Sequence, residues 1–188
     1  MKTIKYVIAS VLVLATLLSF AGCSGFKVID DEKVFYKALD DAAGIDKDET
    51  THEKGTTLDG DKVEYYICKN DGDNYYTYIR YKKTDDAMDR FDEFYQDFED
   101  AKNDGDYDGS HVMSETKTRG SVIFNGTIGA DTAMGFFHMN QYFFDDSDIF
   151  GGVYVNENVY IEAYSVNGSK RDKEKITNFL KELGFPKP

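Results

Sequence analysis

The first 23 residues decide how much of this chain can belong to a folded domain. Lys2 and Lys5 make the start of the chain positive, residues 6–19 are mostly apolar, and residues 20–23 read Phe-Ala-Gly-Cys. A positive start, an apolar run and then small residues is the order found in a secretory signal. Cleavage before Cys23 would leave 166 of the 188 residues, which is the size of one ordinary domain.

The alternative for the same segment is an uncleaved membrane helix. Ser10, Thr16 and Ser19 interrupt the apolar run, which is shorter than the roughly 20 apolar residues that a spanning helix needs. We therefore predict a signal peptide over residues 1–22 that is removed during export.

Cys23, directly after the small pair Ala21-Gly22, resembles the lipobox cysteine of bacterial lipoproteins. In that class the thiol receives a diacylglyceryl group and the chain is cut before the cysteine. The resemblance implies lipidation of Cys23, a short tether over residues 23–30 and a single domain over residues 31–188 at the outer face of a cell membrane. Two or three acyl chains would anchor it stably, whereas one chain holds only reversibly.

The charge of the chain restricts its partners. The formal net charge is −13, and removal of the two signal-peptide lysines makes it −15. Such a field disfavours nucleic acid and anionic lipid headgroups, whereas cations and basic proteins suit it. Besides the membrane reached through the lipid, we expect a protein or a glycan as partner, and no nucleic acid. The charge can also serve solubility alone.

The residue types that carry catalysis are sparse and scattered. Cys68, the remaining thiol, lies in an aromatic, strand-like run, where a small buried residue is the ordinary role. A nucleophilic cysteine needs an activating neighbour, and the sequence does not locate one. The sequence has no H-E-x-x-H, G-x-S-x-G or phosphate-binding glycine motif. We expect no enzymatic activity, and a hydrolase is the least favoured alternative.

Apolar periodicity predicts an α+β fold. Helical spacing favours helices near residues 30–44, 85–102 and 169–184. Single-stripe helices and alternating strands favour an antiparallel sheet with the helices packed on one face. A hairpin, a polar link and a helix recur in both halves, which predicts a weak ββα duplication. The expected strands cover residues 63–68, 75–81, 121–125, 136–144, 152–155 and 159–164.

Alternation also sorts the tyrosines of these strands. Tyr160 and Tyr164 fall on the face opposite the aliphatic residues of their strand, and Tyr76 and Tyr78 share one face of theirs. If the aliphatic residues meet the helices, these four tyrosines form a partly exposed platform for a protein or glycan ligand. The alternative is ordinary half-burial of strand tyrosines.

The closing run V-Y-I-E-A-Y, a polar link and K-I-T-N-F-L-K-E-L-G-F resembles the end of small uncharacterised lipoproteins of Gram-positive bacteria. Those proteins commonly carry an earlier ββα unit with an aromatic strand and an A-x-x-x-F helix, and residues 75–81 followed by 87–91 are similar. The resemblance implies the lipoprotein class and an αββα-type domain, and it implies no activity.

One sequence motif matches a metal-binding pattern. Residues 104–115 satisfy the calcium-loop pattern D-x-[DN]-x-[DN]-G-x5-E. In such a loop the early carboxylates, one backbone carbonyl and the closing bidentate glutamate surround Ca²⁺. The corresponding ligands here are Asp104, Asp106, Asp108, the carbonyl of Ser110, and Glu115.

Two observations oppose this interpretation. Val112 stands at a position that usually holds a water, and residues 116–124 look like a turn and a strand rather than the second helix of an EF-hand. Asp-Gly-Asp also occurs at residues 59–61 and 71–73, so the alternative is an ordinary acidic turn. A calcium-binding module is therefore the second functional hypothesis, beside a non-enzymatic binding domain.

Overall fold

The computed structural model describes residues 26–58, 60–130, 132 and 146–188. The predicted signal peptide, Cys23 and the strand expected over residues 136–144 lie outside these ranges. Within them, the helices are α2 (Glu32–Ala43), the short 3-10 helix η1 (Lys47–Glu49), α3 (Thr84–Asp104) and α5 (Lys170–Glu182). The strands are β1 (Thr51–Lys54), β2 (Thr57–Leu58), β3 (Asp61–Asp71), β4 (Asn74–Tyr81), β5 (Tyr107–Thr116), β6 (Arg119–Ile128), β7 (Ser147–Asn156) and β8 (Val159–Val166).

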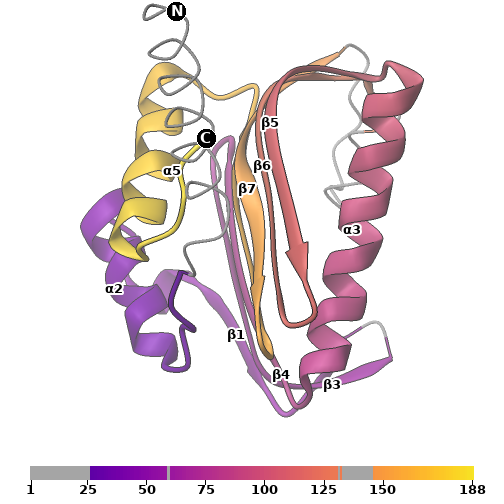
Figure 1. Cartoon of the computed structure of the whole chain (residues 1–188). Helices are drawn as coiled ribbons and strands as arrows, with labels where there is room; N and C mark the ends of the chain where they lie inside the picture. The colour runs from indigo at the N-terminus through magenta and orange to yellow at the C-terminus, as the bar shows by residue number, and fades with distance from the viewer. Residues whose placement is uncertain (1–25, 59, 131, 133–145) are drawn as a thin grey trace, which may run out of the picture.

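The strands form one eight-stranded antiparallel sheet with helices on both sides. The order is β1-β3-β4-β8-β7-β6-β5, and β2 pairs with β3 beside this path. The last strand in the chain, β8, therefore lies between β4 and β7. Helices α2 and α5 cover one face and α3 crosses the other (Figure 1). The α+β class with an antiparallel sheet is confirmed, whereas the helices that we expected on one face lie on two.

The helix ends follow local sequence signals. Asp31 caps α2, because its carboxylate accepts a hydrogen bond from the backbone N–H of Lys33 at 3.0 Å. Gly44 ends this helix in the left-handed region, with φ of 69°. Ser169 and Asp172 form a capping box at the start of α5.

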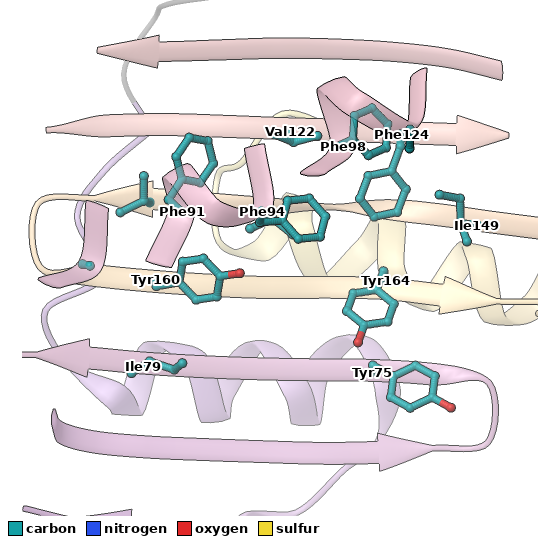
Figure 2. Packing of buried hydrophobic residues seen from close by; sticks show 14 of the residues in the cluster. Tyr75, Ile79, Phe91, Phe94, Phe98, Val122, Phe124, Ile149, Tyr160 and Tyr164 are labelled. Carbon is teal, nitrogen blue, oxygen red and sulfur yellow. The ribbon is translucent and has the colours of Figure 1, made fainter. Parts of the chain in front are cut away.

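Both faces of the central strands are apolar, and this explains the two helical layers. In β8 every residue except Glu162 is buried, so alternate side chains enter opposite cores. On the α3 side, Phe91, Phe94 and Phe98 of the helix cover the sheet (Figure 2). The strand tyrosines are packed here as core residues. The prediction of a single covered face assumed that they are half-exposed.

Gly120 lets α3 approach the sheet closely. A Cβ atom at this position would lie 2.1 Å from Cε1 of Phe91, which is far inside van der Waals contact. The ring of Phe91 therefore occupies the space above the glycine, and its side chain is completely buried.

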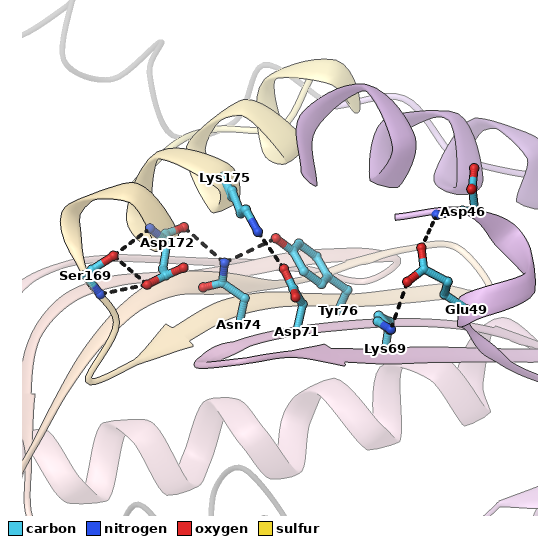
Figure 3. A network of polar contacts seen from close by, with 9 residues as sticks. All are labelled: Asp46, Glu49, Lys69, Asp71, Asn74, Tyr76, Ser169, Asp172 and Lys175. Atoms are coloured by element: carbon cyan, nitrogen blue, oxygen red, sulfur yellow. Dashed lines mark hydrogen bonds and ion pairs between the residues drawn. The ribbon is translucent and has the colours of Figure 1, made fainter. Parts of the chain in front are cut away.

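Polar contacts join α5 to the turn between β3 and β4 (Figure 3). The amide nitrogen of Asn74 donates to the backbone carbonyl of Asp172 at 3.2 Å, and Lys175 pairs with Asp71 at 2.6 Å. Asn74 is fully buried, so this hydrogen bond satisfies a donor that has lost water.

The predicted ββα pattern occurs twice, as β3–β4–α3 and as β7–β8–α5. The two units differ in arrangement, because α3 covers one face of the sheet and α5 the other. They share the order of their elements and not the side to which the helix returns.

Candidate functional site

Tyr76 and Tyr78 lie beneath α2 and α5. Both are completely buried. The ring of Tyr76 packs against Phe179 with centroids 4.9 Å apart, and the hydroxyl of Tyr78 donates to the carbonyl of Ile29 at 2.9 Å. Burial raises the pKa of both hydroxyls above the ordinary value of 10.0. Neither side chain is placed to meet an external ligand.

Tyr160 and Tyr164 are buried on the opposite face, beneath α3. The hydroxyl of Tyr160 donates to Glu162 at 2.7 Å, and Tyr164 stacks on Tyr75 with centroids 5.2 Å apart. The four tyrosines are therefore divided between two cores, and the exposed platform that the sequence predicted is not formed. The physical reason is that two helical layers, rather than one, cover the sheet.

The residues of the calcium pattern are spread along a strand. Asp104 ends α3, and Asp108, Ser110 and Glu115 belong to β5. An extended strand rises about 3.4 Å per residue, so Glu115 lies roughly 24 Å along the strand from Asp108. Calcium ligands must approach one ion to about 2.5 Å. The predicted closed loop is therefore not formed.

Asp106, the remaining carboxylate of that pattern, has another role. Its Oδ2 accepts a hydrogen bond from the hydroxyl of Thr132 at 2.9 Å. Within the part of the chain that the structure describes, no three His, Cys, Asp or Glu side chains converge as a metal-ligand set.

Glu115 instead interacts with a carboxylate of α3. Partial burial, and then the charge of Asp92, raise the pKa of Glu115 above its ordinary 4.5. Partial burial, and then the charge of Asp89, likewise raise the pKa of Asp92 above 3.8. Like charges therefore repel one another where α3 meets β5.

This repulsion predicts a stabilising substitution, Asp92→Asn. A raised carboxyl pKa means that the folded state holds its proton more tightly, so the associated stability is present at low pH and is lost as pH rises through the raised pKa. The variant should melt at a higher temperature than the wild type at pH 7, and at nearly the same temperature at pH 3. Thermal unfolding at both pH values measures this. Asp40→Asn, an exposed carboxylate on α2, removes the same charge and should show no such pH-dependent gain.

The outer face of α3 is strongly acidic. Nine of its 21 residues are Asp or Glu, and two are Arg or Lys. In α5, on the other side of the sheet, five of 13 residues are Lys or Arg and three are Asp or Glu. Helix α2, on the same side of the sheet as α5, has two Lys and three Asp or Glu, so this side is nearly neutral, whereas the α3 side is acidic.

The two ends of the described chain meet on the α5 side. Phe26 packs against Phe185 and Tyr154, with ring centroids 4.7 and 5.7 Å away. The hydroxyl of Tyr154 donates to the carbonyl of Pro186 at 2.7 Å, and the amide of Asn156 donates to the carbonyl of Phe26 at 2.6 Å. This cluster could not be predicted from the sequence, because its members are distant in the chain and share only their aromatic character.

Cys68 is partly buried on β3 and forms no disulfide. Burial, and then a hydrogen bond with Cys68, raise the pKa of Tyr66 above 10.0.

None of the described helices has the length and apolar character needed to cross a membrane. Comparison of the chain with protein-family models, with curated proteins and with solved structures gave no match.

Proposed function

We propose that this chain is a lipoprotein, anchored through Cys23 to the outer face of a cell membrane, whose domain binds a partner without catalysing a reaction. The observation that carries the proposal is the run Phe20-Ala21-Gly22-Cys23 after a positive and apolar start. Phe26 is fixed on the α5 side by its contacts with Tyr154 and Phe185. Two residues, Ser24 and Gly25, separate it from Cys23, so the three Cα–Cα steps between them span at most about 11 Å. A lipid on Cys23 would therefore hold the α5 side close to the bilayer.

The charge distribution supports the same orientation. The side that carries the tether is the nearly neutral one, and the acidic helix α3 lies on the other face of the sheet. Anionic headgroups attract lysine and arginine and repel carboxylates within a Debye length of the surface. The face presented to the surroundings is then the acidic one, which suits a basic partner.

The lipid anchor is tested by expressing the full chain in a bacterium that processes lipoproteins. The wild type should be recovered in the membrane fraction, and mass spectrometry should find the mature chain starting at a lipidated Cys23. Cys23→Ala should be recovered in the soluble or secreted fraction, because it offers no thiol for the acyl group.

Cys68→Ala is the matched control, because it removes the other thiol of the chain and should leave membrane recovery unchanged. Membrane retention of Cys23→Ala, together with an unmodified Cys23 in the wild type, would contradict the proposal.

A further inference from the structure

The edge strand β5 is long and exposed. It lies at the end of the sheet order, and within the described ranges its one strand partner is β6, which pairs with all ten of its residues. Asp108 to Val112 are exposed without interruption. The opposite edge strand, β1, has four residues. A long open edge presents unpaired backbone groups that can accept another strand.

The register shows which backbone groups point outward. The N–H of Gly129 donates to the carbonyl of Asp106 at 2.9 Å, in line with the register that continues through β5 and β6. Hydrogen-bonded and non-hydrogen-bonded pairs alternate along an antiparallel ladder. The odd-numbered residues of β5, from Tyr107 to Glu115, therefore direct their N–H and C=O groups away from β6.

A groove beside this edge could receive a side chain of an added strand. Its volume is about 90 Å³, and its lining includes Val112, Ile123, Phe124, Lys187 and Pro188. Val112 is 51% exposed, although valine is a residue usually found in cores.

The charged residues around this edge determine which side chains an added strand should carry. Glu115 lies on β5 itself, and Asp92 of α3 is close enough to raise its pKa. Partial burial raises the pKa of Tyr95 of α3 above 10.0, and the charges of Glu99 and Glu115 raise it further. These two carboxylates therefore lie near the same tyrosine. A lysine or arginine placed here would relieve the repulsion, whereas a second copy of this acidic chain would add to it.

We propose that β5 is the docking edge for an extended segment of a partner protein that is rich in lysine or arginine and adds to the sheet as a ninth strand. This names the partner class for the binding role proposed above. The backbone of β5 supplies the hydrogen bonds and the carboxylates supply selectivity. The inference does not depend on lipidation, so a negative result with Cys23 would leave it standing.

The test uses the full chain in neutral detergent and a labelled ten-residue peptide that alternates lysine with valine. Fluorescence anisotropy should show saturable binding of this peptide, and none of a matched peptide that alternates glutamate with valine. His111→Pro removes an outward N–H without breaking the ladder to β6, and should weaken binding by at least about tenfold. Glu115→Lys should weaken it similarly, whereas Asp40→Lys on α2 should bind like the wild type.

A second measurement covers the case in which His111→Pro does not fold. Hydrogen exchange of the wild type should show that the peptide protects the amides of Met113 and Glu115 and leaves those of Val112 and Ser114 unchanged. Undiminished binding by a folded His111→Pro, or protection elsewhere in the chain, would overturn the proposal. A dimer that His111→Pro dissolves, with no peptide binding, would assign the edge to a second copy instead.

Discussion

Replacement of Phe91 by alanine is expected to lower the free energy of unfolding by about 3–5 kcal/mol, the usual cost of removing a buried phenylalanine ring. Phe91 is completely buried, and its ring fills the space above Gly120. The glycine has no side chain that could move into the cavity. The cost should therefore lie in the upper half of that range, and urea unfolding of the two proteins would measure it.

A double-mutant cycle makes this prediction specific. Gly120→Val alone should also destabilise the protein strongly, because a Cβ atom at that position would overlap the ring of Phe91. In the Phe91→Ala background the same valine should be tolerated, since it enters the vacated space and suits a strand. Additive losses in the double mutant would show that the ring and the glycine do not hold α3 to the sheet together.

Phe179→Ala should cost a similar amount, about 3–5 kcal/mol, on the opposite face. Phe179 of α5 is completely buried, with ring centroids 5.3 Å from Phe35 of α2 and 4.9 Å from Tyr76 of β4. Its removal would loosen three elements at one point. Asn178→Ala changes the neighbouring exposed residue and should alter stability by less than about 0.5 kcal/mol.

The cooperativity of unfolding decides how this loss should be interpreted. If the two layers share one cooperative unit, far-ultraviolet and near-ultraviolet circular dichroism should report the same midpoint in Phe179→Ala. An early loss of helical signal with the aromatic signal retained would mean that α5 unfolds separately, and the prediction for this residue would fail.

Features encoded by neighbouring residues could be predicted from the sequence. The cap at Asp31, the left-handed Gly44 and the capping box at Ser169 each depend on a few adjacent positions. The turn between β3 and β4 falls at Gly72-Asp73, within the Asp-Gly-Asp segment at residues 71–73. The acidic character of α3 could likewise be read directly.

Features that depend on distant pairing could not be predicted. The Asp108-Gly109-Ser110 run of β5 has the local composition of a turn, and it becomes part of a strand because ten residues of β6 pair with β5. Tyr160 can occupy a half-exposed or a buried position, and only the presence of α3 above it decides between them. The candidate edge at β5 follows from sheet order, which the alternation of one strand does not contain.

The place of β8 in the sheet has a consequence for how the chain becomes a folded protein. Strand β4 is complete at residue 81, yet one of its two neighbours is formed by residues 159–166. A polypeptide emerging from a ribosome or a translocation channel must therefore release nearly its whole length before the middle of the sheet can close. Until then both inner strands, β4 and β7, present open edges. A partner that shields such edges during emergence, or a rate of emergence faster than self-association, would govern the yield of native protein.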